Sequence, residues 1–140
     1  MYEDGVKIEI KGTEYYLVMN VLAYKQICDK YKSIENIGRI LAREGDAEIL
    51  AQNPTETLAE VIEIFANEGA ETLRDAGEEA TPTITKEQIM RRVLPKQIPL
   101  LTPLVMEAVR KGIAMEGAPD EGGEETRDLV LEEIEAEKNA

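Results

Sequence analysis

Hydrophobic and polar residues alternate along one short stretch of the chain, VKIEIKGTEYYLVMN at residues 6–20. This alternation predicts two strands joined by Lys11-Gly12, because glycine accepts the positive φ that a tight hairpin turn requires. The return strand carries apolar residues on both of its faces. A two-stranded hairpin is only marginally stable by itself. We therefore expect both faces of this hairpin to be covered, at least in part.

Beyond residue 20, apolar residues recur at the three- and four-residue spacing of amphipathic helices. The spacing predicts helices over residues 21–32, from 34 to before Gly45, over 55–73 and 86–94, and from 103 to near Gly117. Expected N-terminal residues are Asn20, Ser33, Thr55, Thr85 (in a capping box with Gln88) and Thr102, which precedes Pro103. Residues 47–54 fit neither pattern. The prediction is an α+β fold, predominantly helical, with an N-terminal β-hairpin packed on a bundle of four to five helices.

Acidic residues dominate the charge of the chain, with 29 Asp and Glu against 16 Lys and Arg and a net charge of -13. Glu60, Glu63 and Glu68 fall off the apolar stripe of the longest helix, so we expect them to face solvent. An acidic surface repels phosphate groups, so we expect no binding to nucleic acid or to an anionic membrane.

The C-terminal end differs in composition from the rest, because residues 116–140 hold ten of the acidic residues and begin with the linker-like sequence EGAPDEGGEE. Two parts are expected. Residues 1–115 form the hairpin and helical domain, and residues 116–140 form an acidic linker and tail that is mobile or folds on a partner.

Residues suited to catalysis are scarce. The chain has no His and one Cys, Cys28, which falls on an apolar helix stripe and is expected to be a structural buried thiol. The acidic run Asp120, Glu121, Glu124 and Glu125 lacks the spacing of a calcium loop. Glycine motifs for phosphates or dinucleotides do not occur. We expect no metal, no cofactor and no enzymatic activity.

Cysteine usage and hydropathy bear on the compartment. A single Cys builds no internal disulfide, which fits a reducing compartment. The sequence contains neither a secretory leader pattern nor an apolar run near the ~20 residues of a membrane span. A soluble, cytoplasmic protein is expected.

A basic cluster stands out against this acidity: Lys86, Arg91, Arg92, Lys96, Arg110 and Lys111. One interpretation is a set of cations on solvated helix faces and at helix ends. The other is a patch that meets an acidic surface, either the tail or a neighbouring subunit. The sequence leaves both interpretations open.

Two stretches hold more apolar residues than a small helical bundle needs, the return strand of the hairpin and IPLLTPLVM at 98–106. They are either core, or the lining of a groove for an apolar helix and an edge for a second copy. The candidate partner-binding residues are Tyr15, Tyr16, Val18, Leu100, Leu101, Leu104 and Met106. Replacing Tyr16 and Val18 with lysine tests the second interpretation, which predicts lost self-association in a chain that stays helical.

The hairpin VKIEIKGTEYYLVMN, the helical segment VLAYKQICDKYKSIENIGRIL directly after it and the charged C-terminal end together resemble the tail assembly chaperones of long-tailed bacteriophages and prophages. The resemblance covers about residues 5–115 and lies in architecture and composition. It implies a non-enzymatic protein of the bacterial host cytoplasm that is absent from the mature virion. Such proteins bind apolar helical segments of the tape measure protein, help recruit the tail tube protein, and commonly form homo-oligomers.

The resemblance also implies a second, longer product made by ribosomal frameshifting. Glu137-Lys138-Asn139 can be encoded by GAA AAA AAC, which contains the slippery heptamer A AAA AAC. Two other functions compete with the chaperone. A structural tail or connector component would remain in the particle, whereas an acidic DNA-mimic inhibitor would need regularly spaced carboxylates on an ordered surface.

Overall fold

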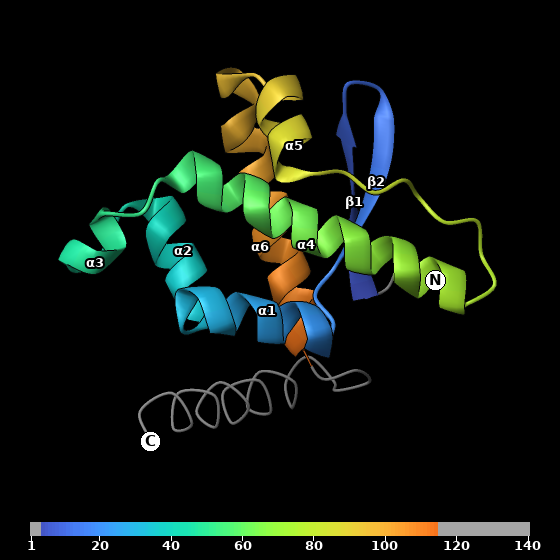
Figure 1. Cartoon of the computed structure of the whole chain (residues 1–140), viewed down its shortest axis with the longest axis horizontal. Helices are drawn as coiled ribbons and strands as arrows, with labels where there is room; N and C mark the ends of the chain where they lie inside the picture. The colour runs from blue at the N-terminus through green and yellow to red at the C-terminus, as the bar shows by residue number, and fades with distance from the viewer. Residues whose placement is uncertain (1–3, 115–140) are drawn as a thin grey trace, which may run out of the picture.

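The computed structural model describes residues 4–114 (Figure 1). Its elements are β1 (Gly5–Ile10), β2 (Thr13–Val18), α1 (Val21–Tyr31), α2 (Ile34–Ala42), α3 (Ala47–Leu50), α4 (Pro54–Asp75), α5 (Lys86–Arg92), the 3₁₀ helix η2 (Pro95–Gln97) and α6 (Ile98–Ile113). The predicted α+β, predominantly helical fold is confirmed. The described residues hold one α-helix more than expected, because residues 47–50 form the single turn α3. The expected tail and its acidic run lie outside the described residues.

The hairpin turns at the predicted position. Lys11 and Gly12 have φ values of 51° and 79°, and Ile10 pairs with Thr13 across them in an antiparallel register. Positive φ at both turn residues matches the right-handed twist of the flanking strands. Val6 therefore faces Leu17, and Ile8 faces Tyr15, on one side of the ribbon.

One face of the hairpin is buried and the other is covered in part, because Tyr16 and Val18 are buried there while Glu9 and Glu14 are exposed. One face, with Ile8, Tyr15 and Leu17, belongs to the main core. The other face carries Tyr16 and Val18, which form a separate buried cluster with Leu73 of α4. Figure 1 shows α4 and α6 crossing beside the two strands, and α4 packs on β2 while α6 packs on β1. The hairpin is a central layer of the domain.

The contact between α4 and β2 depends on Gly69. A Cβ atom at this position would lie 1.7 Å from the backbone oxygen of Tyr16. The helix therefore approaches the strand backbone more closely than any side chain allows. Gly112 of α6 makes a similar approach, because a Cβ there would lie 2.5 Å from the backbone oxygen of Met19.

Most helix starts follow the expected capping chemistry. The Asn20 side chain accepts a hydrogen bond from the Ala23 N–H at 2.9 Å, and Thr85 with Gln88 forms the predicted capping box. Two expectations are wrong in detail. Ser33 precedes α2, but its buried hydroxyl has no hydrogen-bond partner among the described residues. Helix α4 begins one residue early, with Asn53 as its N-cap and Pro54 in its first turn.

The expected N-cap at Thr102 is also wrong. Helix α6 begins at Ile98 with Pro99 in its first turn, and it continues through Pro103. Proline at 103 removes one N–H from the helical ladder. The Thr102 hydroxyl donates to the Ile98 carbonyl, one turn earlier in the helix, at 2.9 Å. Thr102-Pro103 therefore lies inside a helix of 16 residues rather than at its start.

None of the helices in residues 4–114 combines the length and the apolar character that crossing a lipid bilayer requires.

Candidate binding surface

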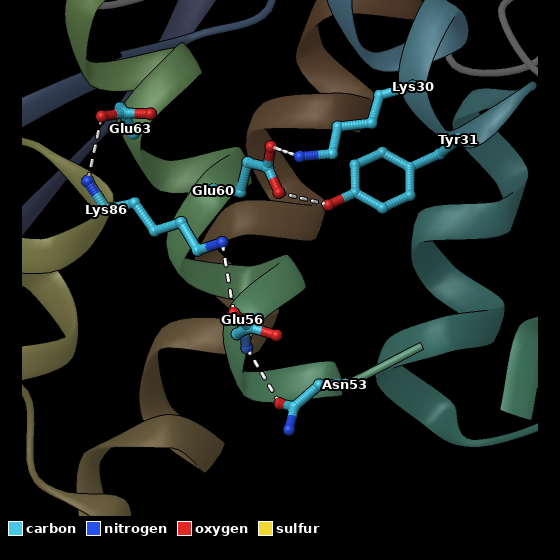
Figure 2. Close-up of polar contacts among 7 residues, drawn as sticks. All are labelled: Lys30, Tyr31, Asn53, Glu56, Glu60, Glu63 and Lys86. Atoms are coloured by element: carbon cyan, nitrogen blue, oxygen red, sulfur yellow. Dashed lines mark hydrogen bonds and ion pairs between the residues drawn. The ribbon is translucent and has the colours of Figure 1, made fainter. Parts of the chain in front are cut away.

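Three glutamates of α4 that were expected to face solvent instead hold neighbouring elements. Glu60 accepts hydrogen bonds from Lys30 and, at 2.7 Å, from the Tyr31 hydroxyl, so it joins α4 to the end of α1 (Figure 2). Glu63 accepts the backbone N–H of Lys86 at 3.0 Å, at the start of α5. Glu68 accepts from the Asn20 amide at 2.9 Å. The polar side of α4 thus positions α1 and α5 and is not a free acidic face.

The Glu60 site has its own electrostatics. Partial burial by itself would raise the pKa of Glu60, but hydrogen bonds from Lys30 and Tyr31 and the charges of Lys30 and Lys86 outweigh burial and lower the pKa below its ordinary value. Burial and the hydrogen bond to Glu60 raise the pKa of Tyr31. The carboxylate therefore stays charged and the phenol stays neutral, which is the pairing that their hydrogen bond needs.

We expect Glu60→Gln to lower the free energy of unfolding by about 1–2 kcal/mol at neutral pH, because charge-assisted hydrogen bonds to a half-buried carboxylate are lost. The folded-state pKa of Glu60 is lowered, so the wild-type advantage exists above the ordinary value of 4.5 and disappears as pH falls through the folded-state pKa. Urea unfolding of both proteins at neutral pH and at about pH 3 measures the difference.

The matched control is Glu71→Gln on the same helix, since Glu71 pairs only with exposed Arg74 and such pairs contribute little. A deficit in Glu60→Gln that is equally large at both pH values would contradict the assignment.

An apolar groove opens between the first turns of α4, helix α5, η2 and the start of α6. Its volume is about 170 Å³. The lining residues are Thr55, Leu58, Ala59, Ile62, Ile89, Met90, Val93, Pro95, Ile98 and Leu101. Nine of these ten side chains are apolar, and Leu58, Ile62, Ile89 and Leu101 belong to the main core. The groove therefore reaches from the surface to the core.

The elements that form this groove also carry exposed apolar side chains. Leu100 of α6 is 69% exposed, and Met90, Leu94 and Leu104 are also exposed. Helix α5 has only seven residues and buries only Ile89, so its other apolar residue, Met90, stays on the surface. A second exposed apolar pair, Val21 and Leu22, lies apart from the groove at the start of α1.

The seven candidate partner-binding residues fall into two groups. Leu100 and Leu104 are exposed, and Met106 is half-buried against the core. Tyr15, Tyr16, Val18 and Leu101 are buried, but Leu101 lines the groove. A buried side chain is not available at the surface of the folded chain, so the idea that Tyr16 and Val18 present a face to a partner is corrected. Their face is covered by α4 through Leu73.

Met90, Val93 and Leu94 were missing from the candidates. The sequence signal was present, since IMRRVLP places four apolar residues around a helix that ends two residues before a proline. A seven-residue helix cannot bury all of them on one face.

The basic cluster divides as well. Lys86 lies 3.3 Å from Glu56, Arg91 pairs with Glu87 and Arg110 pairs with Glu107, while Lys111 donates to the Gly5 carbonyl at 3.0 Å. Arg92 and Lys96 form no ion pair within residues 4–114. These two cations lie on α5 and η2, beside residues that line the groove. Four cations of the cluster thus contact acidic or carbonyl groups of the same chain. Arg92 and Lys96 are the two that stay candidates for contact with an acidic partner.

Three hollows are larger than the groove. One, of about 410 Å³, is lined by Met90 and the charged residues Lys86, Glu87 and Arg91, and the remaining two are polar. The smaller of these two, of about 460 Å³, lies between α1, α2 and α3, and its cations Lys30, Lys32 and Arg39 pair with Glu60, Glu48 and Glu35 respectively. The other, of about 810 Å³, lies between the hairpin turn and residues 78–82 and is lined mainly by acidic and other polar groups. Neither offers the apolar lining of the groove.

Chemically reactive groups are not brought together. Cys28 is half-buried rather than fully buried as expected. Within the part of the chain that the structure describes, no group of three acidic or thiol side chains could hold a metal ion. Among the described residues, the groove combines a mostly apolar lining with access to the core. No protein-family model, no curated protein and no solved structure matches this chain.

Proposed function

We propose that this protein is a non-enzymatic binding module that accepts apolar side chains of a helical client in the groove between α4, α5, η2 and α6. The observation that carries the proposal is a groove that is floored by core residues and lined by exposed Met90. Leu94, Leu100 and Leu104 are also exposed and belong to the segments that form the groove. Grooves of this kind receive the apolar face of an amphipathic helix, which is anchored at three- and four-residue intervals.

The size of the groove supports a peptide client. At about 170 Å³ it is smaller than the roughly 300–1,000 Å³ of small-molecule sites. It has room for one or two anchoring side chains, and the exposed leucines extend the contact along α6. The cations Arg92 and Lys96 at its border add attraction for a client that carries acidic residues beside its apolar face.

By its resemblance to phage tail assembly chaperones, the proposed client is the tape measure protein, with the tail tube protein as the component recruited next. The proposed location is the cytoplasm of the bacterial host, with no place in the mature virion. Covering apolar segments of a long helical protein prevents their aggregation until assembly. The alternative of a DNA mimic is less well supported, because Glu56, Glu60 and Glu63 contact residues of the same chain.

The test is binding of an amphipathic helical peptide with a Leu/Ile face, taken from a tail tape measure protein and followed by fluorescence anisotropy. We expect Met90→Lys and Leu100→Lys each to weaken binding by about tenfold or more, because a charge replaces an apolar contact. Val21→Lys is the matched control, since Val21 is 84% exposed and lies outside the groove. Equal losses in all three variants, or unchanged binding in Met90→Lys, would refute the proposed site.

A further inference from the structure

We propose that the segment Asp128–Ile134 of the same chain binds in this groove and competes there with the client. The inference rests on the groove assigned above as the binding site, and it adds a regulatory occupant. Three observations carry it: the chemistry of the groove border, the sequence of the segment, and the length of chain between them.

The groove combines an apolar floor with a cationic border. Met90, Val93 and Ile98 line it, and Arg92 and Lys96 lie between these residues in sequence on α5 and η2. Within residues 4–114 these two cations have no ion pair. On a chain with a net charge of -13, cations without partners next to an apolar groove favour an occupant that is both apolar and acidic.

Segment Asp128–Ile134, DLVLEEI, has this composition. Val130, Leu131 and Ile134 share one face at helical spacing, since they are separated by three and four residues. Asp128, Glu132 and Glu133 supply the negative charge. A helix-in-groove arrangement places such apolar residues inward and leaves the acids at the border, near Arg92 and Lys96.

The connection has the length that the arrangement needs. Helix α6 runs from the groove at Ile98 to Ile113 over 16 residues, which corresponds to about 24 Å. Fourteen residues lie between Ile113 and Asp128, and they include Gly117, Gly122 and Gly123. A Gly-rich connection of this length has a root-mean-square span of about 19–23 Å. The span matches the distance, so the effective concentration of the segment at the groove is close to its maximum, on the order of 1 mM.

This effective concentration sets the size of the competition. If the isolated segment binds with a dissociation constant of about 100 μM, the ratio of segment-bound to free groove in the full chain is about ten. Client affinity in the full chain is then reduced about tenfold. A tightly binding client displaces the segment, whereas weakly binding proteins are excluded.

Disulfide trapping in the full chain tests the position of the segment without any client. The variants carry Cys28→Ser, Leu131→Cys and a second cysteine, either Met90→Cys in the groove or Val21→Cys. Position 21 is a stringent control, because it lies near Met19, which contacts Gly112 close to the end of α6. We expect oxidation at low protein concentration to trap the Met90→Cys pair as a monomer at least ten times faster than the Val21→Cys pair.

Equal rates, faster trapping at position 21, or a disulfide-linked dimer would overturn the proposal, and the dimer would assign the groove to the segment of a second copy. A second measurement uses the helical peptide described above. In the full chain, Leu131→Lys with Ile134→Lys should raise peptide affinity about tenfold, and unchanged affinity overturns the competition. If the disulfide forms at Met90→Cys but the helical peptide does not bind, segment Asp128–Ile134 binds in the groove and the proposed function is wrong. Failure of this inference can therefore be distinguished from failure of the proposed function.

Discussion

Gly69→Ala is expected to destabilise the protein by at least about 3 kcal/mol, and to leave little folded protein if the wild type is marginally stable. The added Cβ would lie 1.7 Å from the Tyr16 carbonyl oxygen and 2.6 Å from its carbon. These atoms belong to the backbone of β2, so no side-chain rotation relieves the contact. Helix α4 would have to move away from the hairpin and open the cluster of Tyr16, Val18 and Leu73.

Whether Gly69→Ala lowers or raises stability shows whether close packing or helix propensity dominates at this position. Alanine is favoured over glycine inside a helix by about 1 kcal/mol, so an open position would gain stability. Gly38 in α2 is the matched control, because a Cβ there would lie 3.6 Å from the Met106 Cε, at ordinary contact distance. Chemical denaturation followed by circular dichroism should give a neutral or stabilised Gly38→Ala. A stable Gly69→Ala would show that α4 and β2 do not touch as described.

The second large effect is expected at the hairpin, where Tyr16→Ala should cost about 3–5 kcal/mol. Tyr16 is 0% exposed, and its ring fills the space that Gly5 leaves on the neighbouring strand, because a Cβ at Gly5 would lie 2.5 Å from the ring. Removing the ring leaves a cavity between β1, β2 and α4. Denaturant unfolding, with the slope checked for a two-state transition, measures the loss.

Glu14→Ala is the control for this prediction. Glu14 is exposed on the same strand and lies directly opposite Glu9 in the register. Like charges in this position repel each other weakly, so its removal should leave stability unchanged or slightly higher. If Tyr16→Ala kept wild-type stability but lost a self-association that the wild type shows, the earlier view of this face as a partner surface would return.

Features that depend on a few neighbouring residues could be predicted from the sequence. The Lys11-Gly12 turn, the Asn20 cap and the Thr85 capping box each need residues within about four positions of one another. The start of α6 could not, because Pro99 and Pro103 are both acceptable near a helix start. In the structure, Pro99 lies in the first turn of α6, which follows the 3₁₀ turn at residues 95–97 directly and places Leu101 in the core.

Features made by distant elements were the ones missed. The alternation in the return strand indicated that Tyr16 and Val18 form a second apolar face. The neighbouring sequence does not show that Leu73 covers this face. Glu60 looked like an ordinary exposed residue of an amphipathic helix, and its role depends on where the end of α1 lies. The groove joins residues from 55 to 101, so only Leu100 and Leu104 among its exposed surroundings were anticipated.

The position of the hairpin in the chain also bears on synthesis. Its two strands are translated first, yet the residues that enclose them lie far downstream, and the Lys111 side chain reaches back to the Gly5 carbonyl across 106 positions. At about 5–20 residues per second, a ribosome needs roughly 5–20 s to make that interval. Throughout this time β1 lacks the cover that α6 provides. Folding is therefore completed only when α6 has left the exit tunnel, and a nascent chain arrested before it would expose its strand edges to other chains.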